Sequence, residues 1–537
     1  MSAEEFDYVV VGAGSAGCAV AARLTEDPNV SVCLLEAGGP DSSVLIHAPA
    51  GVAALVPTPI SNWCYKTVPQ KGLNGRQGYQ PRGKTLGGSS SINAMLYVRG
   101  HRWDYDHWAG LGNAGWSYAE VLPYFKRSEN NENFRNAFHG QGGPLNVMNP
   151  RSPSGLNRAF LEAARLNGLP ENADYNGEEL FGSFMYQVTH RNGERCSAAK
   201  AYLTPNLSRP NLKVLTHALS ARIILEGRNA RGVAYYRDGT LSEARARREV
   251  VVSSGAFGSP QLLMLSGIGP AGELQRHGIG VVHALEGVGR NLQDHIDYVQ
   301  TYRTRSDTET FGLSIRGTAK VARAMLEWRN HRTGLITSSY AESGAFLRSA
   351  PEVNVPDLQL IFVVGMVDDH NRRLHLGHGF SCHVTVARPK SVGRVGLNSS
   401  DPREAPMIDP RFLEDERDLH LLVKGAQLQQ AILESKPLDP YRGEMLYPVR
   451  RDDPKDIAED IRARADTQYH PVGTCKMGPE DDPLAVLDAR LRVRGIAGLR
   501  VADASVMPTL IGGNTNAPAI MIGEKAADMI REDARSA

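Results

Sequence analysis

A short N-terminal segment restricts the fold of this chain more than any other feature. Phe6–Val11 is a largely apolar run that ends in three valines, and Gly12-Ala13-Gly14-Ser15-Ala16-Gly17 follows it directly. Small residues of helical composition come next, over 18–25, and a second apolar run, Val30–Leu35, ends at Glu36. Strand, glycine turn, helix, strand and acid within ~30 residues predict a βαβ unit that binds a dinucleotide.

Each glycine of this G-x-G-x-x-G turn has its own task. Gly12 permits the tight turn, Gly14 lets the backbone approach a pyrophosphate, and Gly17 lets the helix pack closely on the strand. The helix N-terminus, which includes Ser15 and Ala16, is expected to present free N–H groups to the phosphates. The turn therefore predicts where the phosphates lie.

The acid at the end of the second strand indicates which dinucleotides fit. Glu36, followed by Ala37, stands 19 residues after Gly17 and is placed to accept hydrogen bonds from a ribose diol. A carboxylate there would repel a 2′-phosphate, so NADP is disfavoured. The motif by itself leaves FAD and NAD open.

Composition excludes several classes of function. The 537 residues carry 60 Lys+Arg and 59 Asp+Glu, a net charge of +1, which is untypical of a nucleic-acid-binding protein. The six cysteines form no C-x-x-C pair, as expected in a reducing compartment. The acidic N-terminus lacks the basic start of a secretory signal, and no apolar run reaches the ~20 residues of a membrane span. We expect a cytoplasmic protein, with peripheral contact to the inner membrane left open.

Further elements of the nucleotide domain are predicted far along the chain. A strand is expected at Glu249–Ser253, a helix at Gln261–Leu265, a short strand at Leu499–Val501 and a helix at Pro518–Arg531. Their separation predicts a nucleotide domain assembled from distant stretches of the chain.

The region between these stretches has a different pattern. Over about 300–460, runs such as Asp357–Val364 and His383–Ala387 alternate as antiparallel strands do. A sheet-based domain is therefore expected as an insertion.

Two other stretches resemble functional motifs but lack the surrounding sequence that those motifs require. Gly78–Thr85 satisfies the phosphate-loop pattern G-x-x-x-x-G-K-[ST], but no buried strand precedes it and the glycines and serines after Leu86 disfavour the required helix. His370, His375, His378 and His383 cluster without the spacing of a common metal site. We expect neither nucleotide hydrolysis nor a bound metal.

Four features, in their order along the chain, resemble the glucose–methanol–choline (GMC) family of flavin oxidoreductases. They are the N-terminal βαβ unit, Gly83-Lys84-Thr85-Leu86-Gly87-Gly88-Ser89-Ser90-Ser91-Ile92-Asn93, the stretch from Gly255-Ala256-Phe257-Gly258-Ser259-Pro260 to Ser266-Gly267-Ile268-Gly269, and the C-terminal pair Tyr469-His470-Pro471-Val472-Gly473-Thr474 and Gly513-Asn514-Thr515-Asn516. The resemblance covers nearly the whole chain.

The resemblance implies a mixed α/β fold that binds FAD rather than NAD. A Rossmann-like FAD-binding domain built from discontinuous segments is joined to a substrate domain with a large antiparallel sheet flanked by helices. The expected FAD-binding segments are 1–150, 211–305 and 461–537, the last of which carries the catalytic residues, and the substrate-domain segments are 151–210 and 306–460.

The resemblance also places the cofactor contacts. The stretch from Gly87 to Asn93, which includes Ser90, would lie along the pyrophosphate and isoalloxazine, and the residues from Asn93 through Ala94 and Met95 to Leu96 beside the reactive flavin edge. Ser220 would touch adenine, Asp503 and Ala504 the ribityl–phosphate region, and the helix after Asn514 and Thr515 the flavin pyrimidine ring. Some members attach FAD through a histidine where this chain has Ile92, so non-covalent FAD is expected.

The same resemblance assigns the chemistry. His470 matches the family's catalytic histidine, and imidazole suits a general base because its ordinary pKa of ~6.5 is close to working pH. Asn514 would hold the alcohol oxygen by a hydrogen bond. Glu342 and Tyr469 are candidate substrate-binding residues. Glu342 suits the ammonium of choline but suits a structural acid as well.

The expected substrate is a primary alcohol, followed by choline and then by sugar hydroxyls. The expected electron acceptor is a quinone or a dye-like compound, with oxygen as the alternative. A lyase that keeps FAD as a structural group is the non-redox alternative. The oligomeric state is left open.

Overall fold

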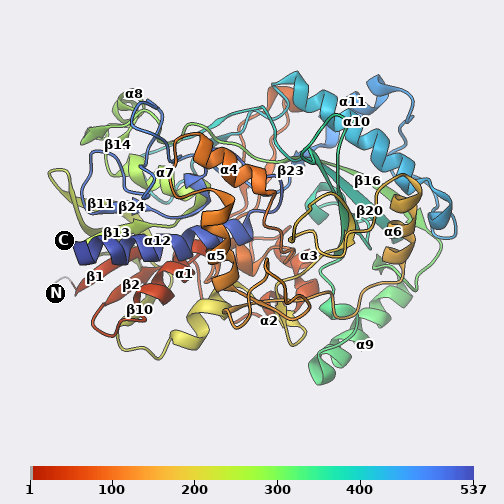
Figure 1. Cartoon of the computed structure of the whole chain (residues 1–537), viewed down its shortest axis with the longest axis horizontal. Helices are drawn as coiled ribbons and strands as arrows, with labels where there is room; N and C mark the ends of the chain where they lie inside the picture. Colours follow the sequence, from red (N-terminus) through yellow and green to blue (C-terminus); the bar gives the residue numbers. More distant parts are fainter. Residues whose placement is uncertain (1–3, 537) are drawn as a thin grey trace.

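Two seven-stranded sheets organise residues 4–536, which the computed structural model describes. One sheet lies at the end of the molecule that holds both chain ends, and the other lies toward the opposite end (Figure 1). Helices flank both sheets, so the mixed α/β fold expected from the sequence is confirmed. The domain boundaries expected from the sequence stay a prediction.

The first sheet joins strands from both halves of the chain. Its order is β10-β2-β1-β13-β12-β11, with β24 also paired to β13. The strands are β1 (Glu4–Val11), β2 (Val32–Leu35), β10 (Leu212–Leu215), β11 (Leu219–Glu226), β12 (Asn229–Arg237), β13 (Thr240–Val252) and β24 (Leu499–Val501). The pairs of β1 with β2 and β13, β2 with β10, and β13 with β24 are parallel.

The predicted βαβ unit is present at the centre of this sheet. Phe6–Val11 is buried throughout, as expected for a parallel strand covered on both faces. Helix α1 (Ser15–Leu24) begins three residues before the predicted start because Gly14 is its N-cap. The strand predicted at Val30–Leu35 is shorter and begins at Val32.

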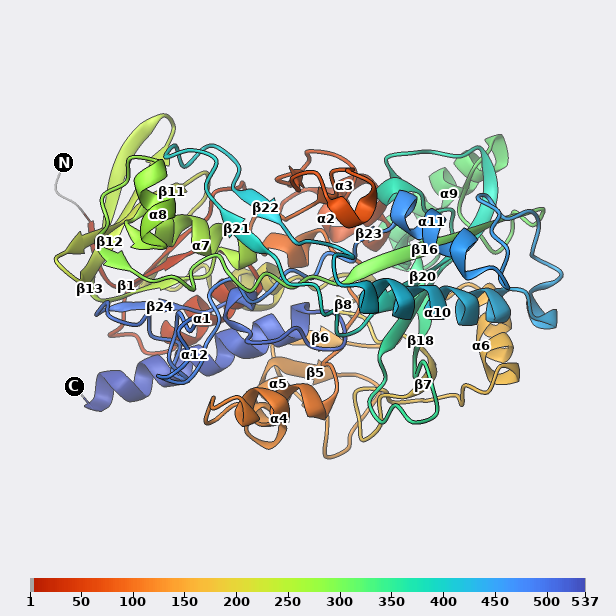
Figure 2. The ribbon, with the colours of Figure 1, turned by 90° about the horizontal axis from the view of Figure 1, so that it is seen from above.

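Helix α1 packs against the C-terminal helix α12 (Asn516–Ser536), and the two lie along the same side of the first sheet (Figure 2). A Cβ on Gly523 would lie 2.5 Å from the carbonyl oxygen of Ala16, so glycine permits this close approach. Arg23 of α1 pairs with the buried Glu524 of α12 at 2.8 Å. Residues about 500 positions apart thus form one face of the fold.

Two predicted elements are longer than their sequence pattern. The strand predicted at Glu249–Ser253 is the end of the 13-residue β13, whose charged first half pairs with β12. Helix α7 (Gly255–Leu265) begins six residues before the predicted Gln261. Asp503 accepts a hydrogen bond from the N–H of Gly255 at 2.9 Å and so caps α7 from a distant part of the chain.

The second sheet is antiparallel, as expected. Its order is β23-β16-β20-β19-β18-β7, with β17 also paired to β20. The strands are β7 (Gly182–Met185), β16 (Ile296–Thr304), β17 (Gly312–Leu313), β18 (Ala341–Leu347), β19 (Leu358–Val363), β20 (Gly377–Val386) and β23 (Asp466–Thr467).

Alternation along β19 separates the two faces of this sheet. Leu358, Leu360 and Phe362 belong to the hydrophobic core shared with the covering helices, whereas Ile361 and Val363 line a cavity on the other face. Those helices include α6 (Leu156–Leu166), α10 (Glu416–Leu433) and α11 (Pro454–Arg464). The period of two predicted from the sequence therefore assigns each side chain to its face.

The remaining elements connect or flank the sheets. The helices are α2 (Val44–His47), α3 (Val52–Leu55), α4 (Arg102–Gly110), α5 (Tyr118–Ser128), α8 (Ala271–Arg276) and α9 (Ile315–His331). Short strand pairs are β3 (Tyr65–Lys66) with β4 (Tyr79–Gln80), β5 (Glu129–Asn131) with β6 (Leu145–Val147), β8 (His190–Arg191) with β9 (Glu194–Arg195), β14 (Ile268–Gly269) with β15 (His283–Ala284), and β21 (Arg394–Gly396) with β22 (Met407–Asp409). Within residues 4–536, every helix is too short or too polar to span a bilayer.

Candidate active site

A cavity of about 980 Å³ is lined by residues of both sheets and of the loops between them. Most of the residues expected to bind cofactor or substrate line it: Gly12, Gly14, Ser15, Ala16, Glu36, Ala37, Asn93, Ala94, Met95, Leu96, Ser220, Tyr469, His470, Asp503, Ala504, Asn514 and Thr515. The fold thus brings these residues, from five distant stretches, around one space.

The glycine turn forms one end of this cavity. Gly12 has φ +95°, and a Cβ there would lie 2.5 Å from the carbonyl oxygen of Ser253. A Cβ on Gly17 would lie 1.9 Å from the carbonyl oxygen of Gly12, so this glycine holds α1 against β1. Gly14, in contrast, faces open space, with its nearest neighbour atom 3.9 Å from the Cβ position. This cradle fits a pyrophosphate at the N-terminus of α1.

The carboxylate of Glu36 is fixed by the backbone at the same end. It accepts hydrogen bonds from the N–H groups of Ala13 at 3.0 Å and Gly38 at 2.8 Å. Burial raises the pKa of Glu36 to about 7, against the effect of these hydrogen bonds. A ribose diol that donates to this carboxylate would satisfy its remaining acceptor positions.

Three of the predicted cofactor residues support the wall and do not line it. Gly17 lies inside the α1–β1 contact. Gly87, with φ +85°, donates its N–H to the carbonyl oxygen of Ala13 at 2.7 Å. The hydroxyl of Ser90 donates to the carbonyl oxygen of Gly87 at 2.6 Å and accepts from the N–H of Ala198. They shape the loop that passes the glycine turn.

Ser220 and Asp503, the residues predicted near the adenine and the ribityl–phosphate region, differ in their hydrogen bonding. The hydroxyl of Ser220 on β11 is buried without a hydrogen-bond partner among the described residues. Asp503 accepts from the hydroxyl of Ser259 at 2.6 Å and from two backbone N–H groups, and burial raises its pKa. Asp503 therefore positions α7 as well as lining the cavity.

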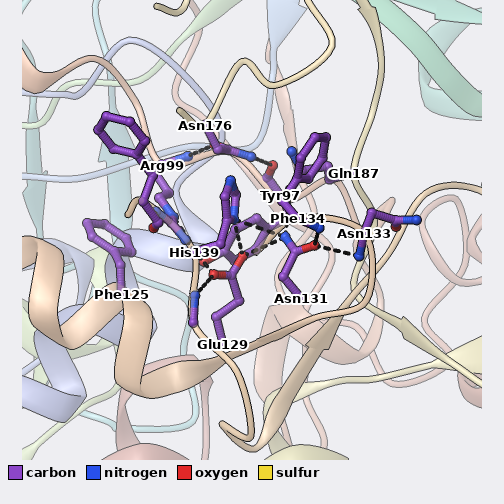
Figure 3. A network of polar contacts seen from close by, with 12 residues as sticks. Tyr97, Arg99, Phe125, Glu129, Asn131, Asn133, Phe134, His139, Asn176 and Gln187 are labelled. Atoms are coloured by element: carbon purple, nitrogen blue, oxygen red, sulfur yellow. Dashed lines mark hydrogen bonds and ion pairs between the residues drawn. The ribbon is translucent and has the colours of Figure 1, made fainter. Parts of the chain in front are cut away.

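The segment that carries Asn93 to Leu96 is anchored by a buried polar network (Figure 3). Arg99, two residues past Tyr97, forms a buried ion pair with Glu129 at 2.7 Å. His139 bridges Glu129 at 3.0 Å and Asp174 at 2.9 Å. Because each charge has a partner, the network fixes the chain that directly follows this part of the cavity wall.

His470 and Asn514 meet at the cavity. The side-chain amide nitrogen of Asn514 lies 3.1 Å from Nε2 of His470. The amide oxygen of Asn514 accepts from Nε2 of Gln359, on β19, at 3.0 Å. Since this contact fixes the amide orientation, the Asn514 nitrogen donates and Nε2 of His470 accepts.

A second imidazole holds the other side of His470. Nδ1 of His295 lies 2.9 Å from Nδ1 of His470, and Nε2 of His295 lies 2.9 Å from the carbonyl oxygen of Ala387. A carbonyl only accepts, so Nε2 of His295 carries the proton and its Nδ1 accepts from Nδ1–H of His470. This chain of contacts leaves the lone pair of His470 on Nε2, beside Asn514.

Burial keeps both imidazoles neutral. The pKa of His470 lies well below its ordinary value because of burial, with smaller effects from His295 and Arg82. Burial also lowers the pKa of His295 to about 4. A neutral imidazole with Nε2 unprotonated can accept a proton from a hydroxyl group in the cavity.

Tyr469, beside His470, belongs to a separate contact chain. Its hydroxyl lies 2.6 Å from Nδ1 of His370, whose Nε2 lies 3.1 Å from Asp466. Tyr469 and His370 both have positive φ, +72° and +56°. Both line the cavity, so the strained backbone directs these side chains to its wall.

Glu342 is not brought to the cavity. Its carboxylate accepts from the N–H of Ser154 at 2.9 Å and from the amide of Asn157 at 2.6 Å, at the start of α6. Burial raises its pKa. This environment fits the structural acid that the sequence left as an alternative.

The four clustered histidines have separate partners. His370 contacts Tyr469 and Asp466, His375 contacts Asp368, His378 contacts Ser314, and His383 contacts Asp297. Among residues 4–536, no group of three or more His, Cys, Asp or Glu side chains is arranged to hold a metal ion. In the stretch that matches the phosphate-loop pattern, Gly78–Thr85, no helix begins at Lys84 or Thr85.

Sequence reasoning missed His295, Asp294 and Gln359. Asp294 accepts the backbone N–H of His470 at 2.9 Å and so fixes its position. The one available signal was the polar run Gln293-Asp294-His295 directly before strand β16. Gln359 gave no signal, because its position in an alternating strand suits any polar residue.

Comparison with known proteins agrees with this geometry. The N-terminal model of the GMC oxidoreductase family matches residues 6–297, and the C-terminal model matches 389–523. An alcohol dehydrogenase [acceptor] from Pseudomonas putida is 43% identical over 98% of this chain and 95% of its own length. The mitochondrial choline dehydrogenase of Homo sapiens is 44% identical over 99% of this chain and 90% of its own.

Solved structures give the same result. The crystal structure of pyridoxine 4-oxidase from Mesorbium loti superposes with a TM-score of 0.89 at 32% identity, covering 98% of this chain and 99% of that one. Formate oxidase superposes with a TM-score of 0.92 at 29% identity, covering the whole of both chains. The chain is an FAD-dependent oxidoreductase of CH–OH donors and belongs to the GMC oxidoreductase family.

Proposed function

We propose that this protein oxidises a primary alcohol to the aldehyde, with His470 as the general base. The observation that carries the proposal is the contact chain from Ala387 through His295, which leaves Nε2 of His470 unprotonated at the cavity. Bound FAD would supply the hydride acceptor, the N5 atom of its ring.

Asn514 orients the substrate oxygen in this proposal. One N–H of its amide faces Nε2 of His470, and the amide is held from behind by Gln359. An alcohol oxygen beside both residues would accept from the other N–H of the Asn514 amide, and its hydroxyl proton would replace the Asn514 contact at Nε2 of His470. Asn514 therefore stabilises the oxygen as negative charge develops on it.

The cavity wall favours a neutral substrate. The second-sheet side contributes apolar and aromatic residues, among them Phe311, Tyr340, Ile361 and Val363. The acidic residues that line the cavity in the described chain are Glu36, Glu404 and Asp503, none of them on that side. A trimethylammonium group would meet aromatic faces there but no carboxylate.

Choline is the second candidate, because choline dehydrogenases are 44% identical to this chain. The experiment that separates the two is an anaerobic panel of 1-octanol, benzyl alcohol and choline with the FAD-loaded protein. We expect the two neutral alcohols, 1-octanol and benzyl alcohol, to bleach the yellow flavin absorbance faster than choline does. Faster bleaching by choline would reverse the order, and no bleaching by any alcohol would favour the lyase alternative.

We propose a quinone or dye-like electron acceptor, since a relative at 43% identity is named an alcohol dehydrogenase [acceptor]. Other relatives are named oxygen-dependent choline dehydrogenases, so oxygen is the alternative. Turnover followed in parallel with an oxygen electrode and a quinone-coupled dye separates the two. Oxygen consumption equal to dye reduction would contradict the proposal.

FAD is proposed to bind without a covalent bond. Ile92, where some family members attach the flavin, is an apolar residue that lines the cavity. Acid precipitation of the holoenzyme is expected to release all yellow colour into the supernatant. Flavin retained in the pellet would contradict this.

A further inference from the structure

Large apolar side chains are exposed together around α9 and the loop beside it. The exposed fractions are 93% for Ile315, 79% for Leu376, 73% for Leu374, 62% for Leu326, 53% for Met325 and 45% for Leu313. We call these six residues the apolar rim. Single exposed apolar residues need no explanation, but a group of this kind marks an interaction site.

The segments that carry the apolar rim are adjacent in the fold. Leu313 of β17 pairs with Gly377 and forms a bridge with Leu376. Ile315 begins α9 two residues later. Ile315 and Leu326 are eleven residues apart, close to three helical turns, and so lie on the same face of α9.

The outward face of α9 is free because its inner face is anchored. Gly317, Ala324 and Trp328 are buried, and Nε1 of Trp328 donates to the carbonyl oxygen of Gly193 at 2.7 Å. The helix lies at the periphery of the half of the molecule that holds the second sheet, at the lower edge in Figure 1 and at the upper right in Figure 2. It therefore presents its apolar face away from the body of the protein.

Basic residues flank this face. Over its 17 residues α9 carries Arg316, Lys320, Arg323 and Arg329 against one acid, Glu327. Arg316 has Asp307 as an ion-pair partner at 3.7 Å and stays largely exposed, and the exposed Arg373 lies in the adjoining loop. An apolar face with a basic flank is the pattern of helices that lie in the surface of an anionic membrane.

The apolar rim also borders the entrance to the active site. Leu313 and Leu374 line the cavity that holds His470, and α9 contributes Val321 to the same wall. A membrane at this surface would face the cavity. A lipid-soluble quinone and a long-chain alcohol would then reach the site without crossing water.

We propose that the apolar rim and the basic flank of α9 dock this protein on an anionic membrane surface. The docking itself does not depend on the proposed function. Its suggested benefit does, because that benefit is access of a lipid-soluble electron acceptor to the cavity. The leucines, isoleucine and methionine enter the headgroup region, and the arginines contact lipid phosphates.

Sedimentation with vesicles tests the docking directly. The FAD-loaded protein is mixed with vesicles of phosphatidylcholine alone or with about 30% phosphatidylglycerol, at low and high salt. We expect binding to the anionic vesicles that weakens with salt. The pair Ile315→Ser and Leu326→Ser is expected to lower the partition coefficient at least about tenfold, and the pair Arg316→Glu and Arg323→Glu to remove the preference for anionic lipid.

Leu241→Ser is the matched control, because Leu241 is an exposed leucine on the first sheet, remote from α9. It is expected to bind vesicles like the unchanged protein. Equal binding by the Ile315/Leu326 pair, or no vesicle binding by the unchanged protein, would overturn the proposal. A dimer in size-exclusion chromatography that the Ile315/Leu326 pair dissociates would show that a second copy covers the surface instead.

Dye-coupled turnover of a water-soluble alcohol is measured on the same variants. None of the five substituted residues lines the cavity, so this activity is expected to be unchanged. Vesicle binding without any alcohol oxidation would overturn the proposed function and leave the docking standing.

Discussion

The Nδ1 atoms of His295 and His470 lie 2.9 Å apart, and the rings stand at 89° to each other. One proton lies between these two nitrogen atoms. Because Nε2–H of His295 donates to the carbonyl oxygen of Ala387, that proton is on Nδ1 of His470. His295 is therefore a positioning residue, which acts on the reaction through His470.

Removing the general base tests the centre of the proposal. In His470→Ala, alcohol oxidation is expected to fall by roughly 10²–10⁴-fold, because no other group accepts the hydroxyl proton. FAD content should stay normal, since His470 is expected to contact the substrate. The measurements are steady-state kcat and the flavin spectrum, and turnover near that of the unchanged enzyme would refute the assignment.

Substitution of His295 separates positioning from packing. His295→Gln keeps an acceptor for Nδ1–H of His470, whereas His295→Leu removes it. We expect kcat to fall by about 10–100-fold in the leucine variant and by only a few-fold in the glutamine variant. If both variants lose the same activity with unchanged pH profiles, the tautomer argument fails.

Activity should persist into mildly acidic solution. The lowered pKa of His470 keeps Nε2 unprotonated at and below the ordinary histidine pKa of ~6.5. We expect kcat/KM to be constant from neutral pH down to below that value and to fall only in stronger acid. A profile that already declines around pH 7 would contradict the lowered pKa.

The same burial reduces stability in acid. Below pH ~6.5 the unfolded chain protonates His295, but the folded chain, with a pKa of about 4, does not. The free energy of unfolding should therefore decrease as pH falls through this window, by about 3 kcal/mol for a shift of this size. Urea unfolding of the unchanged protein and of His295→Gln, compared at several pH values, measures the difference, and parallel curves would contradict it.

Glu342→Gln distinguishes a structural acid from a choline ligand. Because the carboxylate contacts Ser154 and Asn157 away from the cavity, we expect the ratio of kcat/KM for choline and for a neutral alcohol to change by less than about twofold. Lower stability in urea is expected from the changed hydrogen bonds. A KM increase of about tenfold for choline alone would restore the ammonium-binding interpretation.

Much of the first sheet could be predicted because its signals are local. The turn between β1 and α1 is set by steric demands within six residues, and Leu499–Val501 was predicted with its observed bounds. The start of α7 could not be predicted, since Gly255 is capped by Asp503, which comes 248 residues later.

The same distinction applies to the site. His470 and Asn514 belong to motifs, but the direction of Glu342 depends on the distant start of α6. His295 acts through one contact with a residue 175 positions away. Contacts of this kind leave no pattern in the sequence near either partner.

The alternation of cavity-facing and core-facing side chains along β19 has a consequence for engineering. Ile361 and Val363 line the cavity, whereas Leu360 and Phe362, their neighbours in sequence, fill the opposite core. A library that varies positions 361 and 363 would reshape the cavity wall, at a cost in the packing of the smaller core that both residues share with Leu96 and Phe184. Variants at these two positions would therefore combine best with changes at the residues that pack against them, while the opposite core is left intact.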